Sequence, residues 1–363
     1  MDIKDAYDMG YAKLTVCNTK VQRQSSSRNT MPSITAFKGS DEGQIVEASV
    51  DKRDLQPDEV LLKITHSGLC GTDVHYKNVP MVLGHEGVGE VQEIGSNVTL
   101  LKKGDRAGFG YNHSSCLSCA QCLSGNDIFC PQRQLYGEAD LDQGSMASHA
   151  VWKESFLFKI PESISSEDAA PLQCGGITVY TALQLYPVKA GERVGVLGVG
   201  GLGHLAIQFA AKMGCEVVVF SGSDSKEEEA IKLGAKEFYA TKGATELKLK
   251  DGKGIDRLLV TSSAQVDWNL YLSVINPRGA VYPLSVSSDD LRMPYMPLIL
   301  NGIRVQGSVV GSRGIHREML EFAAAQNIKP IVQLFPMSKQ GIEDAFQALE
   351  DGKMRYRGVL VAQ

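Results

Sequence analysis

The sequence shows no sign of a membrane-spanning or nucleic-acid-binding protein. Its 37 Lys and Arg residues are outnumbered by 42 Asp and Glu residues, so we expect no basic surface for nucleic acid. The long apolar stretch at residues 194–214 contains several glycines and has charged flanks, which favours a buried strand, loop and helix over a membrane span. Hydrophobic residues make up 43% and charged residues 22% of the 363 residues, as in a globular enzyme of about two domains.

A secretory signal pattern is absent as well. The chain starts with Met-Asp-Ile-Lys-Asp-Ala-Tyr-Asp, which is acidic and has no apolar segment. We therefore expect a reducing compartment, the cytosol, in which thiols stay free. Residues 1–31 predict a loosely packed N-terminal extension, because residues 18–30 are polar, rich in Ser and Gln and without periodicity.

Four of the eight cysteines fall in one short stretch. Cys116, Cys119, Cys122 and Cys130 are separated by two, two and seven residues. Four thiolates at these spacings favour one structural, tetrahedral Zn²⁺. The alternatives are a disulfide pair, four unrelated thiols or an iron–sulfur cluster, whose usual motif has shorter spacings although its proline is matched by Pro131.

The parts of the chain before and after residue 185 or so predict different architectures. In the first part, short β-like runs with glycine-rich corners indicate a partly open β-barrel, with strands at 34–37, 44–50, 60–67 and 88–94. In the second part, alternating strands and helices indicate a doubly wound parallel sheet, with strands at 193–197, 216–220, 256–260, 280–284 and 305–309 and helices at 205–213, 226–233 and 266–274. The chain then closes with helices at 316–326 and 341–350 and a strand at 357–361. We predict a catalytic domain of residues 32–185, completed by 312–363, and a cofactor domain of residues 186–311.

A glycine-rich loop follows the first strand of the second part. Gly198, Gly200 and Gly203 have the spacing of the dinucleotide fingerprint, with Gly201 and Leu202 between them, and a helix starts directly afterwards. The glycines allow a tight turn and the close approach of a pyrophosphate to N–H groups at the helix start. A turn that only packs the helix on the sheet is the alternative, and the strand, helix and second strand together favour a nucleotide.

The end of the second strand bears on which nucleotide binds. NAD is usually held there by an Asp or Glu on the ribose hydroxyl, about 20 residues after the loop. This chain has Ser221 instead, followed by Ser223 and Lys226, whose hydroxyls and ammonium suit the 2′-phosphate of NADP(H). Asp224 keeps NAD open as an alternative if it turns inward, and Ser223 has the simpler interpretation of a helix N-cap.

Three further metal-binding side chains lie in glycine-flanked segments. A lone Cys or His is usually structural, but Cys70, His85 and Cys174 accompany a nucleotide loop. The segment 84–87 (Gly-His-Glu-Gly), the four-cysteine stretch and the glycine loop resemble the zinc-dependent medium-chain dehydrogenase/reductase superfamily, specifically its cinnamyl-alcohol-dehydrogenase-like alcohol dehydrogenases, over residues 33–363. The resemblance implies an α/β protein with a GroES-like, partly open β-barrel catalytic domain and a Rossmann cofactor domain.

The same resemblance implies a second zinc, with a catalytic role. Cys70, His85 and Cys174 would be its ligands, Glu86 an alternate ligand, and Asp73 the group that orients His85 through its other ring nitrogen. Three protein ligands leave one position for an alcohol or aldehyde oxygen, from whose carbon a hydride passes to the nicotinamide or returns.

Four other residues receive roles from the resemblance. Thr72 and His75 fit a relay that carries a proton from the substrate oxygen through the cofactor ribose to solvent. A turn-capping hydroxyl and a partly buried histidine are the simpler interpretations of these two. Thr178 is expected on the nicotinamide side, and Arg357 near the pyrophosphate, unless Arg357 is a surface charge.

The sequence therefore predicts an NADP(H)-dependent, zinc-dependent alcohol dehydrogenase or aldehyde reductase acting on medium or aromatic substrates. Residues 76–83 are shorter than in many relatives, which predicts a wider substrate pocket. An NADPH-dependent reductase of a conjugated C=C or iminium bond and a non-enzymatic cofactor-binding protein are the rival hypotheses. A homodimer paired through the cofactor domains is expected, with the apolar segment 298–310 available for contact.

Overall fold

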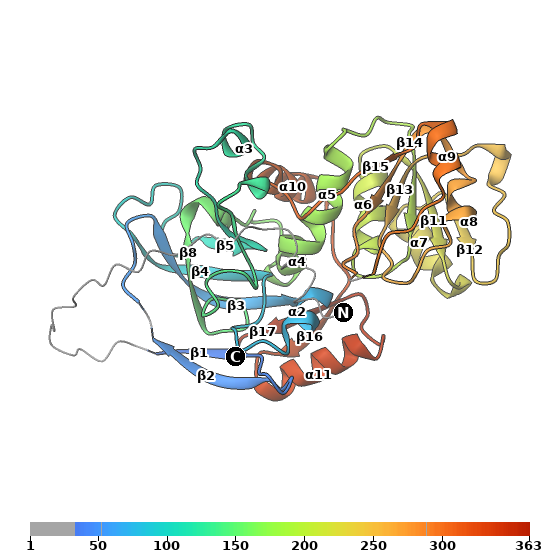
Figure 1. Ribbon diagram of the computed structural model, residues 1–363. Helices are drawn as coiled ribbons and strands as arrows, with labels where there is room; N and C mark the ends of the chain where they lie inside the picture. Colours follow the sequence, from blue (N-terminus) through green and yellow to red (C-terminus); the bar gives the residue numbers. More distant parts are fainter. Residues whose placement is uncertain (1–32, 52, 288) are drawn as a thin grey trace, which may run out of the picture.

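The computed structural model describes residues 33–51, 53–287 and 289–363, which form two lobes side by side (Figure 1). The chain first builds a β-rich lobe, then an α/β lobe, and finally returns to the first lobe. The β-rich lobe and the doubly wound lobe predicted from the sequence are thus both present. The predicted extension, residues 1–31, lies outside the described residues.

Seven strands of the described residues form the main sheet of the β-rich lobe. They run in the order β16, β17, β3, β4, β5 and β9, and β8 also pairs with β3. Strand β3 is central because its apolar residues are buried, with Val60, Leu62 and Ile64 in one cluster with Phe109 and Trp152. The strands are β3 (Glu59–Leu69), β4 (Gly87–Ile94), β5 (Arg106–Phe109), β8 (His149–Lys153), β9 (Phe158–Lys159), β16 (Val332–Pro336) and β17 (Arg357–Val361).

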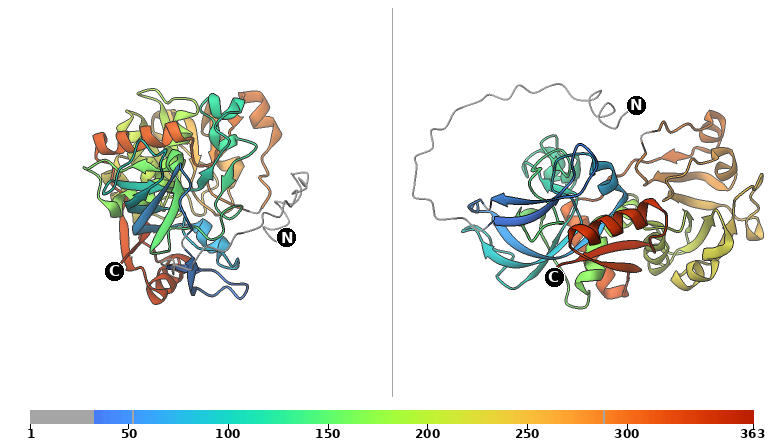
Figure 2. Two further views of the ribbon diagram at one scale, coloured as in Figure 1. Left: turned by 90° about the vertical axis from the view of Figure 1, so that its left-hand side faces the viewer. Right: turned by 90° about the horizontal axis from the view of Figure 1, so that it is seen from below.

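The end of the chain lies inside this sheet. Strand β17 runs antiparallel to β3, with Gly358 opposite Leu69, and parallel to β16. Helix α11 (Lys339–Glu350) packs Ile342 and Phe346 into the same cluster as Leu360 of β17, and it lies along β16 and β17 (Figure 2). The β1–β2 hairpin (Ser33–Lys38 and Val46–Asp51) lies on the same side of the lobe.

Six parallel strands of the described residues form the sheet of the α/β lobe, in the order β12, β11, β10, β13, β14 and β15. The chain moves from β10 outward to β11 and β12 and then returns to place β13 on the other side of β10. A crevice for a ligand is expected at such a reversal, beyond the carboxyl end of β10. The strands are β10 (Arg193–Leu197), β11 (Glu216–Ser221), β12 (Glu237–Ala240), β13 (Ile255–Val260), β14 (Ile275–Pro283) and β15 (Arg304–Val305).

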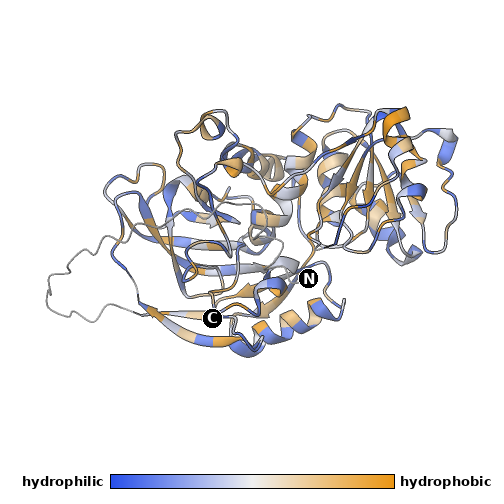
Figure 3. Ribbon diagram, in the orientation of Figure 1, coloured by the Kyte–Doolittle hydropathy of each residue, from blue (hydrophilic) through white to orange (hydrophobic). Residues whose placement is uncertain are grey.

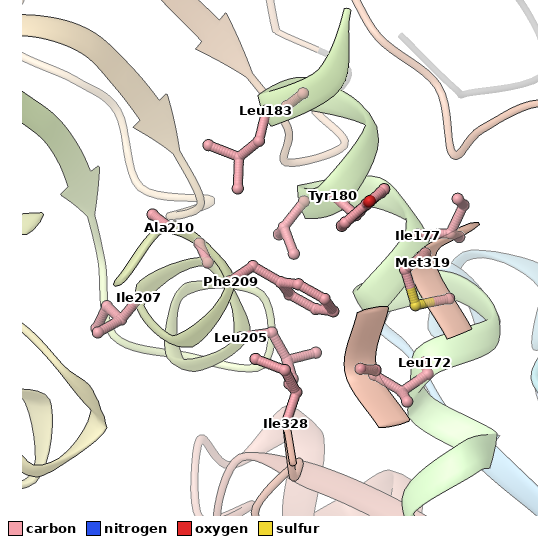
Figure 4. Packing of buried hydrophobic residues seen from close by; sticks show 14 of the residues in the cluster. Leu172, Ile177, Tyr180, Leu183, Leu205, Ile207, Phe209, Ala210, Met319 and Ile328 are labelled. Carbon is pink, nitrogen blue, oxygen red and sulfur yellow. The ribbon is translucent and has the colours of Figure 1, made fainter. Parts of the chain in front are cut away.

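Three helices pack together where the lobes meet. Tyr180 of α5 (Ile177–Gln184) lies edge-on to Phe209 of α6 (Gly203–Lys212), with ring centroids 5.5 Å apart. Met319 of α10 (Arg313–Gln326) belongs to the same buried cluster (Figure 4). This apolar contact joins the glycine-loop helix α6 to the segment that carries Cys174.

The remaining elements are short and are distributed over both lobes. The predicted helix 266–274 is shorter in the structure, where it is represented by α8. The predicted strand 305–309 is represented only by β15, because the chain leaves the sheet after Gln306 to cross back to the β-rich lobe. None of the helices in the described part of the chain is long and apolar enough to cross a membrane. These elements are α2 (Gly71–Tyr76), β6 (Asn112–Ser114), α3 (Ala120–Leu123), η1 (Asp127–Phe129), β7 (Gln134–Leu135), η2 (Glu154–Phe156), α4 (Ser166–Pro171), η3 (Leu172–Gly176), η4 (Asp224–Lys226), α7 (Glu227–Leu233), η5 (Lys250–Gly252), α8 (Trp268–Leu272) and α9 (Tyr295–Asn301).

Candidate active site

Four side chains with metal-binding atoms come together from three parts of the chain. The ligand atoms of Cys70, His85, Glu86 and Cys174 all lie within 4.8 Å of one another. Cys70 follows β3, the His-Glu pair precedes β4, and Cys174 lies in η3, a π-helical turn of a kind that often occurs at functional sites. Spacing in the sequence did not reveal this convergence, because only the fold places the three segments together.

The donor set of this cluster fits zinc. His85 is fully buried and its Nε2 atom has no hydrogen-bond partner among the described residues, although an orphaned buried nitrogen is costly. Contact with the Cys174 thiol, with smaller contributions from His85 and Arg357, lowers the pKa of Cys70, whereas contact with Cys70 and burial raise the pKa of Cys174. Two thiolates in this buried place therefore need a cation, and two sulfurs with one imidazole nitrogen are a common zinc set that leaves a position open.

The other ring nitrogen of His85 is held by a carboxylate. Asp73 Oδ1 lies 3.0 Å from His85 Nδ1, and Asp73 Oδ2 accepts a hydrogen bond of 2.9 Å from the N–H of Cys70. Burial disfavours the charged imidazole, but the Asp73 carboxylate outweighs burial and raises the pKa of His85 well above its ordinary value. This contact fixes the ring orientation and leaves Nε2 as the free nitrogen.

Tyr136 is a contact that sequence reasoning missed. Its hydroxyl donates to Asp73 Oδ1 over 3.0 Å and accepts from the N–H of Gly84 over 2.8 Å, and its ring is fully buried. A single tyrosine in a polar stretch carries no motif, so the sequence held no signal for it.

Arg357 is buried, so its interpretation as a surface charge is wrong. Its side chain is 5% exposed and forms an ion pair with Glu86, whose side chain is fully buried. Burial raises the pKa of Glu86 to about 7, although Arg357 opposes this, and Glu86 in turn raises the pKa of Arg357 despite its burial. A Cβ placed on Gly201 would lie 3.1 Å from Arg357 Cδ, so Arg357 lies between the glycine loop and the metal-binding cluster.

Thr72 and His75 both lie on α2, directly after Cys70. Thr72 Oγ1 is 3.8 Å from Cys70 Sγ and is half-buried, whereas His75 is exposed. The two side chains thus extend from the metal-binding cluster towards the surface, and the interpretation of His75 as a partly buried histidine is wrong.

The other four cysteines form a compact second group. Their Sγ atoms are 3.5–3.9 Å apart in four pairs, and all four thiols are free. Backbone N–H groups of Ser118 and Cys119 lower the pKa of Cys116 to about 6. The group surrounds one point from four sides, which suits a single tetrahedral ion closed to other ligands.

The glycine loop has the backbone that a nucleotide requires. Gly198 has φ +97°, a left-handed conformation, and a Cβ on Gly203 would lie 1.9 Å from the Gly198 carbonyl. At Gly200 a Cβ would meet no atom of the described part of the chain within 4 Å, so this side of the loop is open there. Helix α6 begins at Gly203 and offers its first N–H groups at the same place.

The predicted phosphate-binding residues lie at the end of β11. Ser221 is buried at the end of the strand, and Ser223 Oγ is 2.8 Å from Ser225 Oγ. Lys226 donates 2.6 Å to the carbonyl of Val199 in the glycine loop. Ser223 occupies the cap position of η4, but its side chain makes no capping hydrogen bond there, and Asp224 is exposed.

Thr178 lies in the first turn of α5, four residues after Cys174, and is 8% exposed. Helix α5, which carries it, lies where the two lobes meet (Figure 1).

Comparison with known proteins identifies this arrangement as that of a zinc-binding dehydrogenase. Residues 56–162 match the alcohol dehydrogenase GroES-like domain, and residues 201–325 match the zinc-binding dehydrogenase family. The probable formaldehyde dehydrogenase AdhA of Bacillus subtilis (strain 168) is 35% identical over 327 residues, which cover 86% of this chain and 93% of that protein. The chain belongs to the zinc-dependent alcohol dehydrogenases of the medium-chain dehydrogenase/reductase family.

Solved structures agree with this assignment. The cinnamyl alcohol dehydrogenase SbCAD4 from Sorghum bicolor has a TM-score of 0.82 at 31% identity, covering 91% of this chain and 97% of that chain. CAD from Helicobacter pylori, complexed with NADP(H), has a TM-score of 0.79 at 27% identity, and the match covers 91% of this chain and 98% of that chain. Acetophenone reductase from Geotrichum candidum, in complex with NAD, has a TM-score of 0.80 at 26% identity, and the match covers 92% of this chain and 98% of that chain.

Proposed function

We propose that this chain is an NADP(H)-dependent, zinc-dependent alcohol dehydrogenase that interconverts a medium-sized or aromatic primary alcohol and its aldehyde. The observation that supports this most is the cluster of Cys70, His85 and Cys174, joined to the glycine loop by Arg357. A metal-binding cluster and a nucleotide loop at one crevice suit hydride transfer between a bound oxygen compound and a nicotinamide.

In this proposal Cys70, His85 and Cys174 hold the catalytic zinc, and the four-cysteine group holds a structural one. When bound, the catalytic zinc would supply Lewis acidity to the substrate oxygen. Asp73 keeps His85 in the tautomer that presents Nε2. Glu86 forms an ion pair with Arg357 and can act as an alternate zinc ligand if that ion pair opens.

Thr72 and His75 are proposed to move the proton. The Thr72 hydroxyl lies next to the Cys70 sulfur and can accept the substrate hydroxyl proton while passing its own towards the cofactor ribose. His75, which is exposed on the same helix, then exchanges the proton with water. The presence of both groups favours carbonyl chemistry over reduction of a conjugated C=C or iminium bond.

The proposed preference for NADP(H) rests on the end of β11. Ser221 replaces the acid that would hold a free ribose hydroxyl, and Lys226 brings a positive charge to the glycine loop. On this view Thr178 and Arg357 flank the nicotinamide and the pyrophosphate, respectively.

We also propose a homodimer joined through the α/β lobes. Strand β15 is the edge of the six-stranded sheet, and helix α9 beside it is largely hydrophobic (Figure 3). Tyr295, Ile299 and Leu300 of α9 are 79%, 66% and 74% exposed. An exposed apolar helix surface near the edge of a sheet suits contact with a second copy.

Zinc analysis and isotope transfer test the proposal together. The purified full chain should contain two zinc ions, and it should transfer deuterium from labelled NADPH to the former carbonyl carbon of an aromatic aldehyde. Label on an alkene carbon would support the C=C reductase instead. One zinc per chain and no turnover with any aldehyde or alcohol would support a non-enzymatic role.

A further inference from the structure

The base of the four-cysteine loop carries two tyrosines. Strand β6 runs directly into this loop and β7 follows it, and the two strands pair with Asn112 opposite Leu135. Tyr111 precedes β6 and Tyr136 follows β7, and the N–H of Tyr136 donates 2.8 Å to the carbonyl of Tyr111. The strand pair that closes the loop therefore places both rings at one end.

Both tyrosines pack against His85. The centroid of the imidazole is 4.7 Å from that of Tyr136 and 5.7 Å from that of Tyr111. Tyr136 makes the closer contact, and its hydroxyl also donates a hydrogen bond to Asp73. Tyr136 therefore contacts both the His85 imidazole and the carboxylate that orients this imidazole.

The position of Tyr136 is constrained by its neighbours. Gly137 has φ +83°, and a Cβ there would lie 2.2 Å from Tyr76 Cζ, so only glycine allows Tyr76 to pack this closely. Tyr76 lies edge-on to Tyr136 at 5.2 Å and ends α2, the helix that carries Asp73. The hydroxyl of Tyr136 is thus fixed relative to that carboxylate.

We propose that Tyr136 is a positioning residue for His85, acting through Asp73. This inference rests on the metal site of the proposed function. Asp73 is fixed by two donors besides His85, the N–H of Cys70 and the hydroxyl of Tyr136. Without the hydroxyl, Oδ1 loses the donor that holds it in place, and its contact with His85 Nδ1 loosens.

The test is a double-mutant cycle on metal affinity. Tyr136→Phe, Asp73→Asn and the double variant are compared by competition with a zinc chelator, with the four-cysteine zinc as an internal reference. We expect Tyr136→Phe to raise the Kd of the catalytic zinc about tenfold, within the range known for groups that orient metal ligands, and to leave the four-cysteine zinc in place. The double variant should match Asp73→Asn within threefold, because Tyr136 acts through that carboxylate.

A matched control removes a buried hydroxyl elsewhere. Tyr180 donates 2.7 Å to Glu318, and Tyr180→Phe should leave both zinc affinities unchanged. Replacement of the catalytic zinc by Co²⁺ gives a second readout, since Tyr136→Phe should shift the visible d–d bands and Tyr180→Phe should not. This readout decides the matter if Asp73→Asn does not fold.

The inference is wrong if Tyr136→Phe keeps the wild-type Kd and cobalt spectrum, if it weakens both zinc sites equally, or if its effect adds to that of Asp73→Asn. Failure of the proposed function looks different, because the wild-type chain itself would then hold no zinc outside the four-cysteine group.

Discussion

Arg357 contacts the Glu86 carboxylate across 271 residues of sequence, in a place where the two side chains are 5% and 0% exposed. The pair lies beside the metal-binding cluster, and Arg357 also borders Gly201 of the glycine loop. One side chain therefore connects the charge balance of the metal-binding cluster with the glycine loop.

Removing one partner of this pair should destabilise the protein. Arg357→Met leaves a buried carboxylate without its counter-ion, which costs about 3–5 kcal/mol in the free energy of unfolding. Glu86→Gln in the same chain removes the stranded charge and should restore more than half of the loss. Urea unfolding without cofactor measures both, and a double variant as unstable as Arg357→Met alone would contradict this account.

The stability of the α/β lobe should depend on pH through His204. The N–H of Ile331 donates to its Nε2 over 3.1 Å, so the proton is on Nδ1, which faces the Gly200 carbonyl at 3.0 Å. Burial lowers the pKa of His204 to about 4, below the unfolded value of about 6.5. Between these two pKa values the unfolded chain binds one more proton than the folded chain. The free energy of unfolding therefore keeps its full value above pH 6.5 and falls by about 1.4 kcal/mol per pH unit towards pH 4.

Urea unfolding of wild type and His204→Gln from pH 7.5 to 5 checks this expectation. The slope of unfolding free energy against pH should be smaller in the variant by about 1.4 kcal/mol per pH unit, which corresponds to one proton. His316, with a pKa lowered to about 3 by burial, contributes in the same direction in both proteins. Equal slopes would show that His204 is not the group responsible.

Cofactor choice should depend on Lys226. A charge-assisted contact with the 2′-phosphate contributes about 1.5–3 kcal/mol, so Lys226→Ala should raise the KM for NADPH roughly 10- to 100-fold and change that for NADH little. Lys232→Ala is the control, since Lys232 is exposed on α7 and pairs with Glu228. Equal effects on NADPH and NADH would mean that Lys226 only supports the loop through the Val199 carbonyl.

Loss of one cysteine from the four-cysteine group should remove one metal ion. Cys119→Ser is expected to lower the zinc content from two ions to one and the Tm by roughly 10 °C, because the loop loses the ligand that stabilises its folded form. Cys215→Ser, which alters a buried free thiol in the other lobe, should keep both ions. Zinc assay and thermal unfolding distinguish the two, and two ions in Cys119→Ser would contradict the assignment.

The parts of the site with a short-range signal were predictable. The glycine loop and the four cysteines each depend on spacing within one turn or loop, so residue type and separation carry the information. The parallel sheet followed from the alternation of strands and helices, and the sheet of the β-rich lobe followed from short β-like runs with glycine-rich corners. The ends of elements were less clear, because β15 stops where the chain must cross between lobes and its composition there is still that of a strand.

The contacts between distant segments were not predictable. Arg357 meets Glu86 because β17, β3 and β4 are neighbours in the folded sheet, and Tyr136 meets Asp73 because the end of β7 lies against helix α2. Neither residue has a neighbour in sequence that hints at its partner. A basic residue near the end of a chain is most often exposed, so its burial here had to come from the structure.

The position of β17 between β16 and β3 has a consequence for folding. Its antiparallel partner β3 lies far away in the sequence, so this part of the sheet depends on a long-range pairing. Such pairings form slowly, because the entropy of closing a long loop opposes them. The guanidinium that pairs with Glu86 therefore reaches its place only after this non-local contact has formed.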